Sequence, residues 1–278
     1  MKKIKLLSVL AAVALCLTAC VKKPEPEPSP YIQIPCGDEI LSIIPQEGAE
    51  ISDFDFMNFV MDGQQRIYTG HDYTTSFGID VSAHQGDIDW EKVAQSGVEY
   101  VYIRCGYRGY TVGGLNKDKK FDEYIAGAKN AGLKVGVYFF SQATTVDEAR
   151  AEAEYTLEIL DGTDLDLQVM YDWERMYEDD SRTVSVPLDE LTDWCIAFTE
   201  VIQNRGYKAG IYTNRKIAYE GLDIKRLQER NLTFWVAQYD SWPDFYYKHT
   251  IWQYSFKGEI DGINRTVDLN LTFTPLYR

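Results

Sequence analysis

The 278-residue sequence predicts an α/β fold, an irregular TIM-like barrel with eight strands and about five helices, (β/α)5(β)3. From residue 77 onward, short β-rich runs alternate five times with longer helical patterns, which is typical of βα units in a parallel sheet. Three more strand-like runs follow without a long helical period between them. No GxGxxG or GxxxxGKS loop follows the first strand, so a nucleotide-binding fold has no support. We therefore expect a closed barrel rather than an open sheet.

The predicted strands are apolar, β-rich runs bounded by turn residues. They cover 77–81 (FGIDV), 100–105 (YVYIRC), 134–140 (KVGVYFF), 167–172 (LQVMYD), 209–213 (AGIYT), 234–239 (FWVAQY), 250–255 (TIWQYS) and 266–271 (TVDLNL). The helices are expected to begin near Trp90, Asp118, Val146, Leu188 and Arg215. The third and fourth of them repeat apolar residues at i, i+3 and i+4, and the glycines in "NAGLK" and "NRGYK" are suited to stop a helix before a strand.

The region before the barrel divides into three predicted parts. Residues 1–19 place three lysines before a short apolar stretch, which is the pattern of an export signal. The signal ends in "LTAC", which resembles the lipobox of bacterial lipoproteins and implies a lipid on Cys20 that anchors the chain to a membrane. Residues 20–30 are proline-rich and predict an extended tether, and residues 31–76 predict an irregular extension packed on the barrel domain, 77–278.

Composition narrows the classes of partner and cofactor. The formal net charge of −15 argues against nucleic acid, because phosphate binding needs a basic surface. Cys36, Cys105 and Cys195 show no metal-binding spacing and are expected to be unpaired thiols, with a disulfide as the alternative. The three histidines form no HExxH pattern, which argues against a zinc enzyme. We expect neither a metal nor another cofactor, and a monomeric protein.

The run "VMYDWE" ends a predicted strand with two carboxylates. Alternate residues of a strand point to opposite faces, so Tyr171 and Trp173 share one face while Asp172 and Glu174 share the other. The first face suits burial against the helices. The second places both acids at the carboxyl end of the strand, where barrel enzymes have their active sites.

Two other predicted strands repeat this asymmetry. Asp80 faces away from its apolar neighbours in "FGIDV", and so does Asp268 in "TVDLNL". The first and eighth strands are neighbours in a closed barrel, so these two acids should meet. The alternatives are that Asp80 caps the following turn, that Asp268 is a solvated turn residue, or that the cluster binds Mg²⁺ or Ca²⁺.

Clustered carboxylates point to glycoside hydrolysis. Repulsion and burial keep at least one of them protonated, and a general acid beside an ionised carboxylate is what this reaction requires. Aromatic residues near the strand ends are suited to sugar faces, although each could equally be packing. They are Tyr107, Tyr110, Tyr138, Tyr212, Tyr239, Trp242 and Trp252.

The motifs "GIDVSAHQGDIDW", "VGVYFF", "MYDWE", "GIYT", "WVAQY" and "WQYS…GI…VDLN" together resemble glycoside hydrolase family 25, the lysozymes (N-acetylmuramidases) of peptidoglycan. The resemblance runs from about residue 77 to 273. It implies an eight-stranded barrel and cleavage of the β-1,4 bond between N-acetylmuramic acid and N-acetylglucosamine. Glu174 matches the family's general acid, Asp172 its partner carboxylate, and Asp80 and Asp268 two further acidic positions. We expect the substrate to contact Tyr138, Tyr212, Gln238, Tyr239, Gln253 and Arg104.

Some alternatives remain open at this point. Asp172 could orient the substrate's acetamido group for attack, giving retention, or activate a water, giving inversion. A glycan-binding lipoprotein without catalysis and a chitinase-like hydrolase of N-acetylglucosamine polymers are the competing functions. The expected location is outside the cytoplasm, with the protein lipid-anchored to a bacterial membrane and peptidoglycan strands as its partner.

Overall fold

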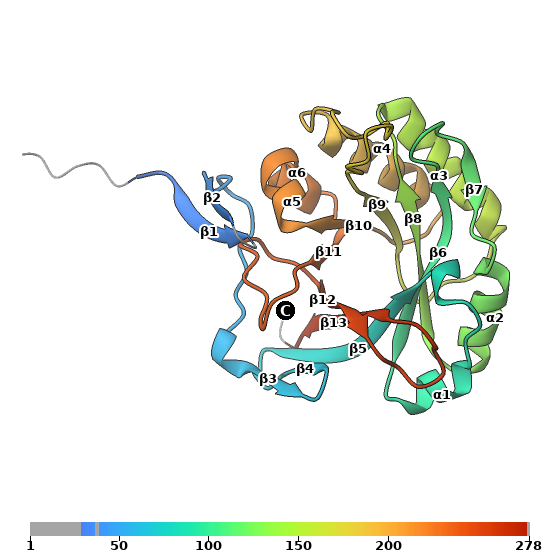
Figure 1. The fold of residues 1–278 in the computed structure, drawn as a ribbon. Coiled ribbons are helices and arrows are strands. Elements are labelled where there is room, and N and C mark those ends of the chain that lie inside the picture. The colour runs from blue at the N-terminus through green and yellow to red at the C-terminus, as the bar shows by residue number, and fades with distance from the viewer. Residues whose placement is uncertain (1–28, 37–38, 277–278) are drawn as a thin grey trace, which may run out of the picture.

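A computed structural model describes residues 29–36 and 39–276, so the predicted signal, Cys20 and most of the tether lie outside the described residues. Eight strands close into a barrel, as predicted (Figure 1). They are β5 (Tyr73–Val81), β6 (Tyr100–Arg108), β8 (Lys134–Ser141), β9 (Val169–Trp173), β10 (Ala209–Asn214), β11 (Thr233–Ala237), β12 (Ile251–Gly258) and β13 (Val267–Pro275).

The barrel closes through its last strand. Neighbouring strands from β5 to β12 run parallel, whereas β13 is antiparallel to both β12 and β5. The start of β13 therefore lies at the same end of the barrel as the carboxyl ends of the parallel strands. In this register Asp268 is paired directly with Asp80. A short strand, β7 (Leu115–Lys117), extends the sheet beside the end of β6.

The described part of the chain holds six α-helices, one more than the expected five. They are α1 (Trp90–Gln95), α2 (Phe121–Asn130), α3 (Val146–Leu160), α4 (Leu191–Asn204), α5 (Arg215–Gly221) and α6 (Ile224–Gln228). The additional helix, α6, begins after Asp223, whose side chain accepts a hydrogen bond from the Arg226 amide at 3.0 Å and so caps the first turn. No helix of residues 29–36 or 39–276 is long and apolar enough to cross a membrane.

Two helices begin three residues later than predicted. Asp118, the expected start of α2, accepts hydrogen bonds from Arg104 and from the Ala83 and Lys120 amides instead of beginning the helix. Leu188, the expected start of α4, lies in a turn in which its carbonyl accepts the Leu191 amide. In both cases a turn precedes the first helical residue, so the helix begins one turn after the expected position.

The inside of the barrel is filled by large side chains. Tyr102 of β6 stacks on Trp235 of β11 with ring centroids 4.9 Å apart, and both are almost completely buried. Glycines on neighbouring strands leave the space that the aromatic rings occupy. A Cβ at Gly78 would lie 2.2 Å from the Tyr100 ring, and one at Gly136 would lie 2.4 Å from the Tyr102 ring. These aromatic side chains fill the barrel directly below the end at which the parallel strands have their carboxyl termini.

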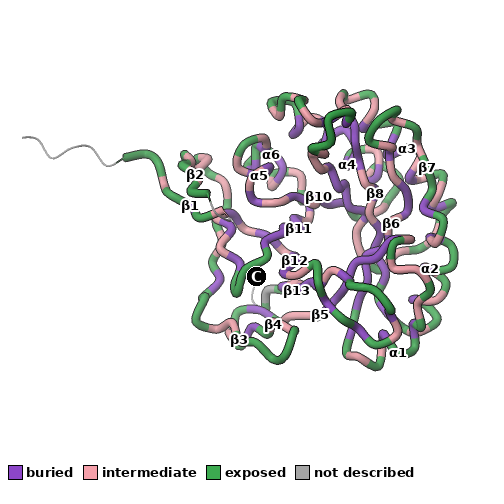
Figure 2. The backbone as a smooth tube through the Cα atoms, viewed as in Figure 1, coloured by how far each residue is buried: buried purple, intermediate pink, exposed green. Residues whose placement is uncertain are grey.

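The larger core lies between the strands and the helices (Figure 2). Trp173 packs against Trp194 of α4 at 5.9 Å and donates a hydrogen bond to the Ala143 carbonyl at 2.8 Å. Tyr171 packs against Phe198 of the same helix at 4.7 Å. The prediction that these two aromatic residues face the helices is confirmed. Cys105 and Cys195 are buried as free thiols, and Cys36 is also free.

The segment before the barrel is more regular than the sequence suggested. It contains two hairpins, β1 (Ile32–Cys36) with β2 (Glu39–Ile43) and β3 (Phe59–Asp62) with β4 (Gln65–Tyr68). Phe54 packs on Phe273 of β13 at 4.2 Å. The β1–β2 hairpin lies beside α5, where the Pro35 carbonyl accepts a hydrogen bond from Arg215, whereas the β3–β4 hairpin lies against β5 and β13 (Figure 1). Strand β5 begins at Tyr73, four residues before the predicted start.

Candidate active site

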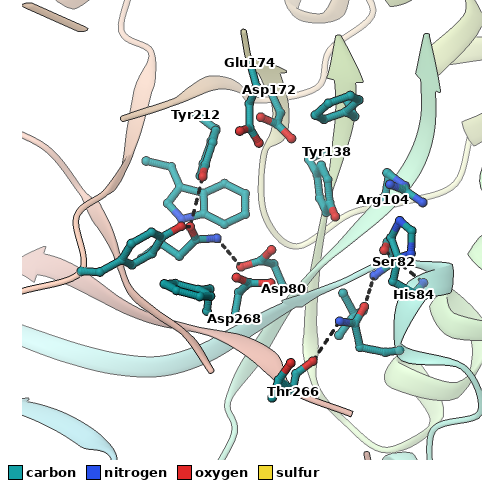
Figure 3. A pocket seen from close by; sticks show the side chains of 17 residues that line it. Asp80, Ser82, His84, Arg104, Tyr138, Asp172, Glu174, Tyr212, Thr266 and Asp268 are labelled. Carbon is teal, nitrogen blue, oxygen red and sulfur yellow. Dashed lines mark hydrogen bonds between the residues drawn. The ribbon is translucent and has the colours of Figure 1, made fainter. Parts of the chain in front are cut away.

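Four carboxyl groups gather at the carboxyl ends of the parallel strands. Asp80 is the penultimate residue of β5, Asp172 the penultimate residue of β9, and Glu174 follows the last residue of β9. Asp268 is the second residue of the antiparallel β13, which places it at the same mouth. All four line one cleft of about 430 Å³ (Figure 3). The strand period in the sequence therefore predicted this convergence.

Asp80 is held in place by two amide side chains. Its Oδ2 accepts hydrogen bonds from Gln253 Nε2 at 2.9 Å and from Asn270 Nδ2 at 2.8 Å. Asn270 is itself fixed, because its Oδ1 accepts a hydrogen bond from the Trp235 indole at 2.8 Å. Burial raises the pKa of Asp80 to about 6, while the two amide donors act in the opposite direction. The two amide donors thus fix the position of this carboxylate and favour its ionised form.

Asp172 is buried beside Glu174 and has one carboxyl oxygen without a donor in the described part of the chain. The residue is 5% exposed, and its Oδ1 has no hydrogen-bond partner among the described residues. Burial raises the pKa of Asp172 well above its ordinary value, and the charges of Glu174 and Asp80 add to the effect, while Arg104 opposes it. A buried acceptor without a donor is costly, so this oxygen is available to a donor on a bound ligand.

Glu174 and Asp268 also have raised pKa values. Burial, followed by the charge of Asp80, raises the pKa of Glu174 to about 7. Burial raises the pKa of Asp268 to about 8, with further repulsion from Asp80 and Glu174. The Glu174 main chain is fixed, because its carbonyl accepts a hydrogen bond from Gln142 Nε2 at 2.6 Å. Near neutral pH the cleft therefore holds both protonated and ionised carboxyl groups. Hydrolysis with a general acid requires this combination.

Most of the expected substrate-binding residues lie in this cleft. Tyr212 and Tyr239 both donate hydrogen bonds to Gln253 Oε1, at 3.1 and 2.9 Å, so Gln253 joins the two tyrosines to Asp80. Tyr138 lines the cleft near the four acids, and Arg104 lines it from one side, where its Nε contacts Asp118 at 2.8 Å (Figure 3). These contacts preorganise the walls around the acids.

Gln238 does not lie in the cleft, contrary to expectation. Trp235 and Tyr239 share the inward phase of β11 and its continuation, whereas Gln238 has the opposite phase. Its amide instead holds the following loop through Asp244 Oδ1 at 2.7 Å. Trp252 also faces outward, donating to the Gln238 carbonyl at 2.6 Å.

Other aromatic candidates lie outside the cleft, and some lining residues were not expected. Trp242 is half-exposed outside the cleft, while Tyr107 and Tyr110 line a neighbouring cavity. The unexpected lining residues include Ser82, His84, Gln85, Phe140, Trp235, Phe256 and Thr266. The position of Trp235 could have been predicted from the sequence, because in "FWVAQY" it lies on the same face of the strand as Tyr239. Phe140 likewise shares the phase of Tyr138 in β8, and Phe256 lies near the end of β12. Ser82, His84 and Gln85 lie in the turn after β5, whose course the sequence did not predict.

Comparison with known proteins gives a consistent family. The sequence model of glycosyl hydrolases family 25 matches residues 79–263. The autolytic lysozyme of Clostridium acetobutylicum is 30% identical over 194 residues, covering 69% of this chain and 54% of that protein. Lysozyme M1 of Streptomyces globisporus is 27% identical over 206 residues, covering 69% and 66%. The match thus spans about half to two thirds of these relatives.

Solved structures share the fold. The modular autolysin LytC of Streptococcus pneumoniae superposes with a TM-score of 0.64 at 24% identity, covering 78% of this chain and 52% of that one. A family 25 glycosyl hydrolase from Bacillus anthracis superposes with a TM-score of 0.59 at 19% identity, covering 76% and 94%. The hairpins before the barrel lie outside the family match. Because that match covers most of the chain and includes Asp80, Asp172 and Glu174, this protein belongs to glycosyl hydrolases family 25.

Proposed function

We propose that this protein is a peptidoglycan hydrolase, a muramidase that cleaves the β-1,4 bond between N-acetylmuramic acid and N-acetylglucosamine. The observation that carries the proposal is the set of four carboxyl groups with raised pKa values in one cleft of a family 25 barrel. Two relatives of the chain are lysozymes, and LytC has been solved in complex with a synthetic peptidoglycan ligand.

Glu174 is the proposed general acid. A pKa of about 7 keeps a large share of this carboxyl protonated near neutral pH, and an acid of this strength can give its proton to the leaving glycosidic oxygen. Asp172 and Glu174 share one proton in this scheme. When Glu174 holds it, the repulsion that raises the pKa of Asp172 is relieved, and Asp172 can ionise beside the Arg104 cation.

Asp172 is proposed to assist the substrate's own acetamido group. Its unpartnered Oδ1 is suited to accept a hydrogen bond from the acetamido N–H, which orients the acetamido oxygen toward the anomeric carbon. Asp80, held by Gln253 and Asn270, supplies negative charge that stabilises the oxocarbenium-like transition state. Asp268 is paired with Asp80 across the two strands, and burial together with the Asp80 charge raises the pKa of Asp268 and favours its protonated form.

The pH dependence of kcat/KM should be bell-shaped with its maximum between about 6 and 7. Activity falls as pH rises through the pKa of Glu174, because the general acid loses its proton. It falls as pH drops through the pKa of Asp80, because the stabilising carboxylate becomes neutral. The measurement is initial rates of reducing-end release from soluble glycan strands at constant ionic strength. A rate that stays constant well above pH 7 would contradict the role given to Glu174.

The direct test of catalysis is a turbidity assay on purified bacterial walls combined with measurement of reducing ends. A muramidase lowers the turbidity and releases reducing ends in proportion. Binding to walls without either change would show a glycan-binding protein instead. Equal activity on chitin oligomers and walls would show a chitinase-like hydrolase.

We further propose that the protein is exported and lipid-anchored outside the cytoplasm through Cys20, with residues 20–30 as a tether and the segment 31–76 joined to the barrel domain. Cys20→Ala should move the protein from the detergent-extracted membrane fraction to the soluble fraction, because the acyl chains supply the membrane affinity. Cys16→Ala, inside the same signal, is the matched control and should behave as the wild type. If the Cys20→Ala protein stays in washed membranes, the anchor is not at Cys20.

A further inference from the structure

A second cavity, of about 530 Å³, adjoins the acidic cleft. The two share His84, Arg104 and Phe140 in their linings, so one continues into the other. The chain that leaves β9 crosses between them, since Glu174 lines the cleft and Met176 lines the second cavity. Arg104 and His84 mark this side of the cleft in Figure 3. A ligand in the cleft can therefore extend a branch into the second cavity.

The charge of the second cavity is opposite to that of the cleft. We call it the basic arm, lined by the cations Arg104, Arg108, Lys117 and Lys119 and by a single carboxylate, Asp118. This is unexpected in a chain with 43 acidic and 28 basic residues. A local excess of cations in an acidic protein indicates an anionic ligand rather than a general surface property.

The cations of the basic arm differ in how many of their hydrogen-bond donors are left to contact a ligand. Arg108 is buried and fully used, with contacts to Glu152 at 2.6 Å and to the Gly113 carbonyl at 2.8 Å. Arg104 uses only its Nε, on Asp118, and its two terminal nitrogens make no hydrogen bond within the described residues. The Arg104 guanidinium lies over the Tyr107 ring at 5.1 Å and lines both cavities, and its two terminal nitrogens remain free to donate hydrogen bonds to a ligand.

The two lysines are the outer cations. Lys119 is exposed and forms no ion pair in the part of the chain that the structure describes. Lys117 pairs with the exposed Asp122 at 2.6 Å, and such a pair is weak enough to exchange for a ligand carboxylate. Tyr107, Tyr110 and Met176 provide apolar surface between the cations. The arm thus combines positive charge with surface for short apolar side chains.

We propose that the basic arm binds the carboxylates of the stem peptide that is attached to N-acetylmuramic acid. The inference rests on the proposed muramidase function and specifies which substrate it prefers. Sugar rings carry no negative charge that would need these lysines, whereas the stem peptide is a branch from the same sugar and carries free carboxylates. Its small apolar side chains suit the tyrosines and Met176. The arm therefore selects peptide-bearing glycan over bare glycan.

The test compares two forms of one substrate. Soluble glycan strands that bear stem peptides are divided, and one half has its carboxylates capped as methylamides. Wild-type enzyme should cleave the uncapped strands about fivefold faster in kcat/KM, which is the effect expected of two partly exposed ion pairs. The Lys117→Gln/Lys119→Gln double variant should lose this preference by slowing on uncapped strands only. Both lysines are exposed, so the variant is expected to fold normally.

The matched control is Lys134→Gln/Lys208→Gln. It removes the same charge from exposed lysines at the amino ends of β8 and β10, at the other end of the barrel, and should keep the wild-type preference. Equal rates of wild-type enzyme on the capped and uncapped strands would overturn the proposal. So would a preference for strands stripped of peptide by an amidase, since the lactyl carboxylate would then be the ligand. Absence of cleavage on every substrate would instead contradict the muramidase function.

Discussion

Glu174→Gln is expected to lower kcat for peptidoglycan cleavage by about a thousandfold, which is within the range of a lost general acid. Glutamine keeps the size of the side chain and its hydrogen-bonding atoms but cannot give a proton to the leaving oxygen. Because substrate contacts elsewhere in the cleft are unchanged, KM should change little. The measurement is reducing-end release from purified glycan strands. Glu178→Gln, an exposed residue on the same connection, is the matched control and should keep full activity.

Thermal unfolding distinguishes this loss of activity from a loss of fold. The pKa of Glu174 is raised from 4.5 to about 7 in the folded protein, so the folded state binds its proton more tightly than the unfolded state. The stability that this group contributes is present at low pH and is lost as pH rises from about 4.5 toward 7. Glutamine does not titrate. At pH 8 the variant should therefore unfold at the same temperature as the wild type or above it, and retained activity in a folded variant would refute the assignment.

Asp172→Asn is expected to lower kcat by about a hundredfold with a small effect on KM, because the acetamido nitrogen gains positive charge only as the bond breaks. Asparagine can still accept a hydrogen bond through its oxygen, but it supplies no negative charge. The residue is buried, so the variant's fold must be checked by circular dichroism. Asp179→Asn, on an exposed loop, is the control and should be fully active.

Product stereochemistry separates the two roles open to Asp172. If Asp172 orients the acetamido group, the configuration is retained, and NMR of a fresh digest shows the β-anomer first. If Asp172 activates a water, the α-anomer appears first. The α-anomer would therefore contradict the acetamido route while leaving the general acid unaffected.

The sequence predicted the barrel and its acidic mouth because both follow from strand periodicity. The alternation in "VMYDWE" separates Asp172 and Glu174 from Trp173, and the structure confirms that Trp173 faces α4. The pairing of Asp80 with Asp268 followed from closure of the barrel alone. These features need only the period of two and the order of the strands.

Features that depend on long-range contacts were not predicted. The Trp235–Asn270–Asp80 hydrogen bonds join three strands, and no local pattern indicates which amide meets which acid. Gln238 lies outside the cleft because its phase is opposite to that of Trp235 and Tyr239. The basic arm is formed by residues from several loops and strands, so its charge is visible only after folding.

The central claim, that this protein is a muramidase, is tested most directly by mass spectrometry of its products from defined peptidoglycan after reduction with borohydride. Cleavage between N-acetylmuramic acid and N-acetylglucosamine leaves muramic acid at the new reducing end, so the account predicts that N-acetylmuramitol is the reduced terminus. Reduced N-acetylglucosamine at that position, or the absence of new reducing ends, would contradict it.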